Sequence, residues 1–220
     1  MPPRAPWSRR VVSAVIVVLA RLLTGAQARW VGCRPSHRQR VYFANHTSHL
    51  DFIVLWAALP AELRTLTRPV AARDYWERTR WRRYLAGCVF RAVLVDRGAT
   101  APGRDQTALI EAARRTVEQT AAAAGARDSL ILFPEGTRGD GLEVATFKSG
   151  LYHLCRQRPD LELVPVYLDN LNRILPKGEV LPVPLLGSVT FGPPVTLAPG
   201  EDKTAFLART RDTLLNLRRS

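Results

Sequence analysis

Short apolar runs alternate with longer stretches of helix-forming residues from residue 41 to the C-terminus. Runs of this length are typical of buried strands, whereas the longer stretches have the length and composition of helices. Predicted strands cover residues 41–44, 65–71, 89–95, 129–133, 161–168 and 187–191. Predicted helices cover residues 50–59, 75–86, 108–124, 148–158 and 201–218. Such interleaving predicts an α/β fold, in which helices pack on a sheet.

The length of 220 residues allows one domain with a sizeable core and a short appendage. We therefore divide the chain into a basic, apolar helical segment at residues 1–38 and a main domain at residues 39–220. Hydrophobic residues make up 46% of the sequence and charged residues 23%, values that argue against bulk disorder.

The chain has a large excess of positive charge: 32 Lys and Arg residues against 19 Asp and Glu residues give a formal net charge of +13. An excess of this size indicates an anionic partner, either nucleic acid or an anionic membrane surface. Eight arginines precede Asp51, the first acidic residue, so much of the excess lies at the N-terminus.

An apolar run covers residues 11–20 and continues after Arg21 with Leu22 and Leu23. A membrane span needs about 20 apolar residues, so this run is too short to cross a bilayer. It suits a helix that lies in or dips into one leaflet, with arginine side chains reaching the headgroups. Two alternatives remain open: a signal peptide cleaved near the small residues at 25–28, and a helix that docks on the core.

The three cysteines, Cys33, Cys88 and Cys155, are widely spaced and form no Cys-x-x-Cys pair. An odd, scattered set argues against a disulfide framework and against a thiolate zinc site. It favours a protein of a reducing compartment, in which these residues are buried structural thiols.

A histidine and an aspartate flank the junction between a predicted strand and the helix that follows. His46 lies in the loop beyond the strand, where α/β folds place their chemistry, and Asp51 lies in the first helical turn. The Asp51 carboxylate can fix the imidazole tautomer and leave the other nitrogen to take a proton from a hydroxyl. Asn45 and Ser48 suit capping roles. The alternatives are a helix cap beside a surface histidine and a metal site built from His46, His49 and Asp51.

A second polar segment, Phe-Pro-Glu-Gly-Thr-Arg at residues 133–138, follows another predicted strand. Gly136 permits close approach of the backbone to a ligand, Thr137 offers a hydroxyl, and Arg138 presents a planar fork of donors to a phosphate. The alternative is a surface turn with a salt bridge between Glu135 and Arg138.

Four sequence blocks occur in a fixed order along residues 40–170. They are Asn-His-x-Ser-x-x-Asp at 45–51, Arg97 after a strand, Phe-Pro-Glu-Gly-Thr-Arg at 133–138 followed by Phe-Lys-x-Gly at 147–150, and Val-Pro-Val at 164–166. Each block alone has a structural explanation; Arg97, for example, could be a solvated surface arginine. Together and in this order they resemble the glycerophospholipid acyltransferase family, most closely the bacterial 1-acylglycerol-3-phosphate acyltransferases.

The resemblance implies a single layered α/β domain, with a mixed central sheet flanked by helices, that acylates a hydroxyl. His46 would be the general base, oriented by Asp51. The phosphate end of the acceptor would be held by Arg97, Glu135, Gly136, Thr137 and Arg138. Supporting residues would be Asn45, Ser48, Lys148, Gly150 and Pro165, the last of them in the block that shapes the acyl or acceptor pocket.

The resemblance also implies the reaction and its place. An acyl thioester, acyl-CoA or acyl carrier protein, would acylate a lysophospholipid, most directly lysophosphatidic acid to phosphatidic acid, at the cytoplasmic face of a bacterial inner membrane. No cofactor, metal or covalent acyl-enzyme would be required. The sequence departs from the family pattern at residues 139–141, where a serine is common after Arg138, and at Asp96. The acceptor is therefore open to glycerol 3-phosphate, another lysophospholipid or a lyso-aminolipid.

The predicted helix at residues 75–86 mixes tryptophans and tyrosines with arginines. This composition suits a membrane interface, a solvated basic helix with core tryptophans, or stacking on single-stranded nucleic acid. Functions of another class are thus a basic nucleic-acid-binding module and a metal-dependent hydrolase. An acyltransferase would have no nucleic-acid partner.

Overall fold

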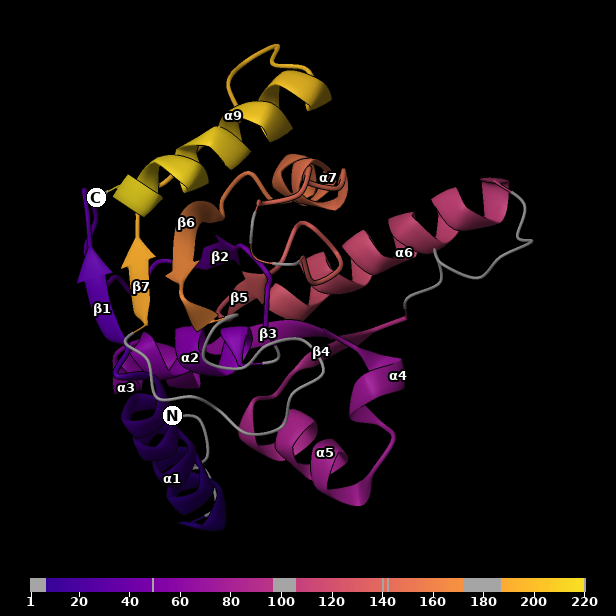
Figure 1. The fold of residues 1–220 in the computed structure, drawn as a ribbon. Coiled ribbons are helices and arrows are strands. Elements are labelled where there is room, and N and C mark those ends of the chain that lie inside the picture. Colours follow the sequence, from indigo (N-terminus) through magenta and orange to yellow (C-terminus); the bar gives the residue numbers. More distant parts are fainter. Residues whose placement is uncertain are drawn as a thin grey trace.

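A mixed sheet lies at the centre of the molecule, with helices on both of its faces (Figure 1). The computed structural model describes residues 7–48, 50–96, 106–139, 141, 143–171 and 187–219, and seven strands are found in this part of the chain. The predicted α/β fold with a mixed central sheet flanked by helices is therefore confirmed.

The strand order places the carboxyl ends of five strands along one edge of the sheet. In chain order the strands are β1 (Gln27–Trp30), β2 (Arg40–Ala44), β3 (Thr67–Ala72), β4 (Val93–Val95), β5 (Ser129–Leu132), β6 (Glu162–Asp169) and β7 (Ser188–Phe191). Their order across the sheet is β1-β7-β6-β2-β5-β3-β4. All neighbouring pairs run parallel except β6 and β7, so β6, β2, β5, β3 and β4 point the same way.

Helices cover both faces of the sheet. The helices are α1 (Trp7–Thr24), α2 (Asp51–Ala58), α3 (Ala61–Thr65), α4 (Arg73–Trp76), α5 (Arg80–Tyr84), the π-helix η1 (Leu85–Val89), α6 (Gln106–Ala124), α7 (Gly150–Gln157), α9 (Lys203–Asn216) and the 3₁₀-helix η2 (Leu217–Arg219). In Figure 1, α1, α2 and α5 lie below the sheet, and α6, α7 and α9 lie above it.

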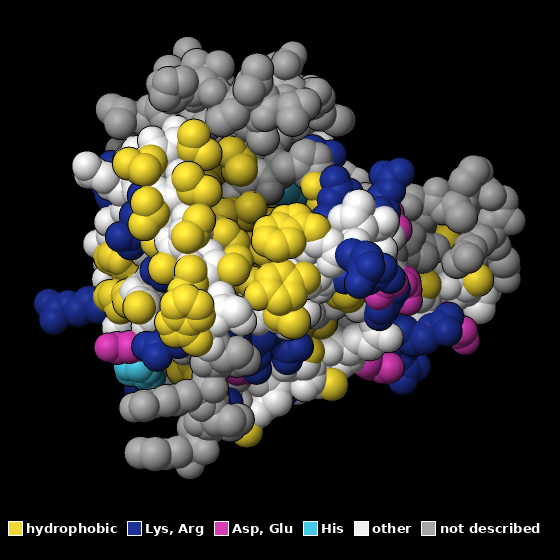
Figure 2. Space-filling view, turned by 90° about the horizontal axis from the view of Figure 1, so that it is seen from below, with side chains coloured by type: hydrophobic (Ala, Val, Ile, Leu, Met, Phe, Trp, Pro, Cys, Tyr) yellow, Lys and Arg dark blue, Asp and Glu magenta, His cyan; other side chains and the backbone are white. Residues whose placement is uncertain are grey.

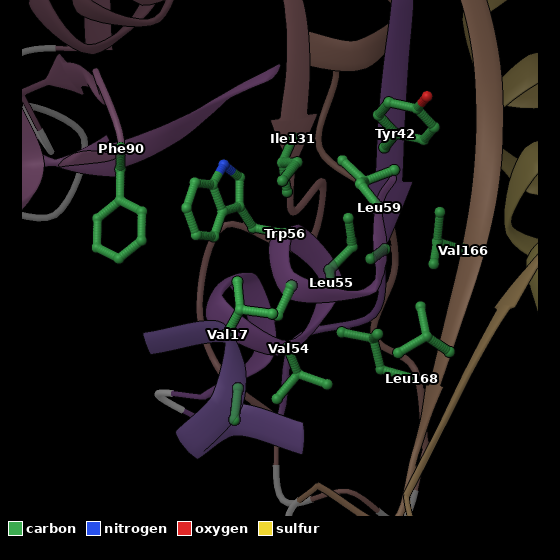
Figure 3. Packing of buried hydrophobic residues seen from close by; sticks show 14 of the residues in the cluster. Val17, Tyr42, Val54, Leu55, Trp56, Leu59, Phe90, Ile131, Val166 and Leu168 are labelled. Carbon is green, nitrogen blue, oxygen red and sulfur yellow. The ribbon is translucent and has the colours of Figure 1, made fainter. Parts of the chain in front are cut away.

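The sheet separates two hydrophobic clusters. Tyr42 and Ala44 of β2 belong to the cluster below the sheet, whereas Val41 and Phe43 belong to the cluster above it. This alternation follows from the two-residue period of a strand. All of β2 is buried because it lies between two parallel strands and is covered on both faces. Figure 3 shows side chains of the lower cluster, which come from α1, α2, the sheet and the end of η1.

The N-terminal helix α1 docks on the core. Its buried residues, Val17, Ala20 and Thr24, lie along one face, and Val17 belongs to the same cluster as Val54 of α2 (Figure 3). The docked alternative for this segment is thus realised. The opposite face remains apolar and exposed, at Trp7, Val11, Val15, Val18, Leu19, Leu22 and Leu23. Within the described residues, none of the helices has the length and apolar character that crossing a bilayer requires.

The predicted helix at residues 75–86 is wrong in detail. The chain forms α4, then a break at residues 77–79, then α5. Thr79 starts the second helix because its hydroxyl accepts the Arg82 N–H at 3.2 Å. Residues 85–89 continue as a π-helix, so the strand predicted at 89–95 begins only at Val93.

The predicted helical segment at residues 1–38 contains a strand. β1 pairs in parallel with β7, from Gln27 opposite Ser188 to Trp30 opposite Phe191. The Trp30 ring stacks on Phe191 at 4.0 Å between centroids. Tertiary pairing therefore creates a strand in Gln-Ala-Arg-Trp, which has no alternation of its own.

Candidate active site

Two neighbouring parallel strands bring the polar segments together. β2 and β5 pair from Val41 opposite Leu130 to Phe43 opposite Leu132. Since both strands run in the same direction, the chain leaves each of them at the same edge of the sheet. Residues 45–51 and 133–138 therefore meet there, although about ninety residues separate them in the sequence. This edge is where open α/β sheets bind their ligands.

His46 and Asp51 form a hydrogen-bonded pair. The imidazole Nδ1 lies 2.8 Å from Asp51 Oδ2, and the Asp51 side chain is fully buried, whereas the His46 side chain is 23% exposed. An ionised carboxylate only accepts hydrogen bonds, so the Nδ1 of His46 carries the proton. This assignment leaves the Nε2 lone pair free to act as a base.

Asp51 also fixes the loop that carries the histidine. Its Oδ2 accepts the N–H groups of Thr47 at 2.6 Å and of Ser48 at 2.8 Å. Because Asp51 is the first residue of α2, its negative charge lies at the positive end of the helix dipole. The second oxygen, Oδ1, is buried without a hydrogen-bond partner among the described residues.

Glu135 lies differently from our expectation. We predicted it among the phosphate-binding residues, but its carboxylate points into the protein and is only 3% exposed. Oε1 accepts the His46 N–H at 2.6 Å, and Oε2 accepts the Ala145 N–H at 2.9 Å. Burial raises the pKa of Glu135, and this effect exceeds the lowering by the two amide hydrogen bonds.

Gly136 makes the turn that presents the candidate phosphate ligands. Its φ is +73°, and a Cβ at this position would lie 2.9 Å from the Cδ, Cε and Nζ atoms of Lys148. The Lys148 backbone N–H donates to the Pro134 carbonyl at 2.8 Å, so the lysine side chain passes directly along the turn. Thr137 is exposed and Arg138 half-buried beside it. Among the ion pairs formed by the described residues, none includes Lys148 or Arg138.

A largely apolar cavity of about 390 Å³ opens beside this turn. Gly136, Thr137, Lys148 and Asp96 form its polar part. The rest is lined by strand ends and by the facing sides of α6 and α7, at Val70, Val95, Ala112, Ala113, Thr116, Val117, Thr120, Leu132, Phe133, Pro134, Ser149, Gly150, Leu151 and Leu154. Such a cavity suits a ligand with one polar end and one apolar chain.

The predicted supporting residues take structural positions. The Asn45 side chain donates to the Leu168 carbonyl at 2.9 Å and accepts the Leu168 N–H at 2.8 Å, so it continues the pairing of β2 with β6. The Ser48 hydroxyl accepts the Leu50 N–H at 3.3 Å. Gly150 begins α7 close to Val117 of α6.

Pro165 lies in β6 opposite Phe43, and its ring lies against Gly192. We expected Pro165 to belong to the block that shapes the acyl or acceptor pocket; it does not line the cavity beside the Gly136 turn. Arg97 and His49 lie outside the described residues. In the part of the chain that is described, no group of three or more His, Cys, Asp and Glu side chains is arranged to hold a metal ion.

Two contacts of His46 were not predicted from the sequence. Its ring stacks on Phe133, with centroids 4.3 Å apart and planes inclined by 23°. Its carbonyl accepts the Gly139 N–H at 2.8 Å. The position of Phe133, first in a polar segment and last in an apolar run, is the signal that could have suggested contact with the histidine loop.

Comparison with known proteins agrees with this arrangement. Residues 31–169 match the protein-family model described as Acyltransferase. This region contains both polar segments and the strands β2 and β5 that lead into them. The chain belongs to the acyltransferase family.

Relatives of this acyltransferase include two proteins described as 1-acyl-sn-glycerol-3-phosphate acyltransferases. The protein of Limnanthes alba is 31% identical over 168 residues, and that of Limnanthes douglasii is 29% identical over 167 residues. Each match covers 74% of this chain and 53% of the relative, so the chain spans about half the length of these relatives.

The fold of the acyltransferase also matches a solved structure. The crystal structure of the 1-acyl-sn-glycerophosphate acyltransferase PlsC from Thermotoga maritima superposes with a TM-score of 0.66 at 18% sequence identity. The superposition covers 96% of this chain and 80% of that one. The two chains therefore share their fold along most of their length.

Proposed function

We propose that this acyltransferase moves a fatty acyl group from acyl-CoA or acyl carrier protein to the free hydroxyl of lysophosphatidic acid, which gives phosphatidic acid. The observation that carries the proposal is the His46–Asp51 pair at the same sheet edge as a cationic turn and an apolar cavity. The two similar proteins named for this reaction support the choice of acceptor.

The His46 imidazole performs the proton transfers. Nε2 takes the proton of the acceptor hydroxyl while that oxygen attacks the carbonyl carbon of the thioester. When the tetrahedral intermediate collapses, the carbon–sulfur bond breaks and His46 returns the proton to the leaving thiolate. The products are the ester and the free thiol, and Asp51 stabilises the imidazolium between the two transfers. The step needs neither a cofactor nor a covalent acyl-enzyme.

The turn at Gly136 holds the phosphate of the acceptor. Lys148 and Arg138 supply positive charge, and Thr137 adds a hydroxyl. The adjoining cavity between α6 and α7 takes an acyl chain. This assignment places the hydroxyl of the acceptor between the turn and the Nε2 of His46.

The decisive assay supplies two donors, radiolabelled acyl-CoA and radiolabelled acylated acyl carrier protein. The acceptors are a panel of lysolipids and glycerol 3-phosphate. We expect acylation of lysophosphatidic acid, its loss in His46→Ala, and an increase in KM for the lysolipid in Arg138→Ala. Parent-level transfer by His46→Ala would remove the histidine from the mechanism. If the enzyme acylates a phosphate-free acceptor, and Arg138→Ala leaves that activity unchanged, lysophosphatidic acid is not the acceptor.

We further propose that the enzyme docks on an anionic membrane at the cytoplasmic face through α1 and α5. Figure 2 shows hydrophobic side chains gathered on this face, with Lys and Arg side chains around them. Trp7 and Leu22 of α1 are 80% and 74% exposed, and Trp81 of α5 is 61% exposed. Exposed arginines accompany the tryptophan, at Arg78, Arg80 and Arg83. Tryptophan at headgroup depth beside arginines on lipid phosphates is a favourable interfacial arrangement.

Vesicle sedimentation tests the membrane proposal. We expect the protein to sediment with vesicles that contain phosphatidylglycerol and to bind phosphatidylcholine vesicles less, because the face is basic. Retention on oligonucleotides with a steep salt dependence, without sedimentation on vesicles, would instead favour the nucleic-acid-binding alternative.

A further inference from the structure

Glu135 joins three segments of the active site. Its side chain leaves the turn at residues 133–138, and its two oxygens accept the N–H groups of His46 and Ala145 at 2.6 and 2.9 Å. Ala145 precedes Lys148, which runs along the Gly136 turn. One buried carboxylate thus connects the loop of the catalytic base to the two segments that carry the candidate phosphate ligands, residues 133–138 and 145–148.

His46 is held from several sides by the same region. Its N–H donates to Glu135, its carbonyl accepts the Gly139 N–H at 2.8 Å, and its ring stacks on Phe133. Asp51 orients the imidazole through Nδ1 but comes from α2, on the other side of the histidine loop. The Asp51 hydrogen bond sets the orientation of the ring, and the contacts with residues 133–139 set how far the histidine backbone lies from the Gly136 turn.

We propose that Glu135 is a positioning residue that fixes the catalytic base relative to the phosphate-binding turn, and that it is not itself a ligand of the phosphate. This inference rests on the proposed function. An acceptor held at its phosphate end must present its hydroxyl to Nε2, and a misplacement of about 1 Å can lower the rate about 10²-fold.

The chemistry of the two partners explains why a carboxylate is required. Both groups that face Glu135 are N–H donors, and an ionised carboxylate offers an acceptor to each. A glutamine has the same shape but only one acceptor oxygen, so its amide NH₂ must face either His46 N–H or Ala145 N–H. Glu135→Gln therefore breaks one connection without creating a cavity.

Steady-state kinetics of Glu135→Gln distinguish positioning from phosphate binding. We expect kcat to fall about 10- to 100-fold while KM for lysophosphatidic acid changes less than about twofold, since the base moves and the phosphate ligands remain. Glu143→Gln is the matched control, because Glu143 is exposed on the same loop and should keep parent kinetics. A raised KM with parent kcat, or parent values for both, would overturn the proposal.

Amide hydrogen exchange tests the connection independently of activity. In Glu135→Gln we expect faster exchange in peptides that cover residues 45–48 or 143–147, and unchanged exchange in peptides from α6. Parent-like exchange in both segments also refutes the proposal. If the parent acylates no lysolipid of the panel, the proposed function fails, and the exchange measurement still decides whether Glu135 holds the histidine loop.

Discussion

Replacing Asp51 by asparagine isolates the charge of the carboxylate from its geometry. Three N–H groups, from His46, Thr47 and Ser48, donate to Oδ2, and the amide oxygen of asparagine can take that position. What is lost is the negative charge beside the imidazolium. At an effective dielectric constant of about 20, two unit charges about 4 Å apart attract by about 4 kcal/mol. A transition state with between half and all of the proton charge loses about 2 to 4 kcal/mol, so kcat should fall between about 30-fold and 10³-fold.

Steady-state acyl transfer with saturating donor measures this loss, and thermal unfolding checks the fold. We expect KM for the lysolipid to stay close to the parent value, because Asp51 is buried and cannot touch the substrate. Asp212→Asn is the matched control, since Asp212 is an exposed carboxylate of α9. A loss below tenfold would refute charge stabilisation. A loss equal to that of His46→Ala would mean that the asparagine reverses the tautomer instead.

Other changes test the turn, the cavity, the membrane face and the buried glutamate. Gly136→Ala should cost roughly 1–2 kcal/mol of unfolding free energy, because φ is positive, and should raise KM for the lysolipid by displacing Lys148; unchanged KM contradicts this. Thr116→Phe should shift acceptor preference to lysophosphatidic acids with shorter acyl chains in a chain-length panel, and an unaltered preference would remove the cavity from acyl binding. Leu22→Asp should weaken vesicle sedimentation, whereas Ile110→Asp, 64% exposed against 74% for Leu22 but on α6, should not; equal effects would exclude α1 as the docking element. The pKa of Glu135 is raised above 4.5, so the folded state holds its proton more tightly than the unfolded state does. The unfolding free energy of the parent, relative to that of Glu135→Gln, should therefore decrease as pH rises from 4.5 through the raised value. Denaturant titrations that show no such decrease contradict the raised pKa.

The central strands β2 and β5 were predictable because they are short and largely apolar. β2 and β5 are buried on both faces, so their sequences contain nearly continuous apolar runs that end at polar residues. The position of the two functional segments followed directly from these ends. Which strands are neighbours could not be predicted, because pairing depends on contacts between residues far apart in the chain.

The peripheral elements were less predictable for a physical reason. β1 has no strand pattern, and its conformation depends on pairing with β7. The break between α4 and α5 depends on one hydroxyl, that of Thr79, in a segment whose arginines and aromatics all tolerate a helix. α1 was predicted as a helix from its composition, but its docking on α2 depends on the shape of the core.

Within the site, residue types were predictable and side-chain directions were not. The sequence spacing sufficed to place the Asp51 carboxylate on the His46 imidazole, since both residues lie within one loop and the helix turn that follows. The direction of Glu135 depends on the turn at Gly136 and on the return of the chain at Ala145. A glutamate in a polar segment is usually exposed, and here the turn directs it inward.

The two buried carboxylates around His46 are better explained by function than by stability. Burial raises the pKa of Glu135 because it disfavours the charged form, although the ionised carboxylate is the form that offers an acceptor oxygen to each of the two N–H groups. Asp51 is fully buried with one oxygen unpartnered among the described residues. Apolar residues of similar volume would often stabilise such positions better than buried charges do. Glu135 fixes the backbone of His46, and Asp51 fixes its ring. Both carboxylates therefore hold Nε2 in position, and this role explains why acidic residues occupy these two buried sites.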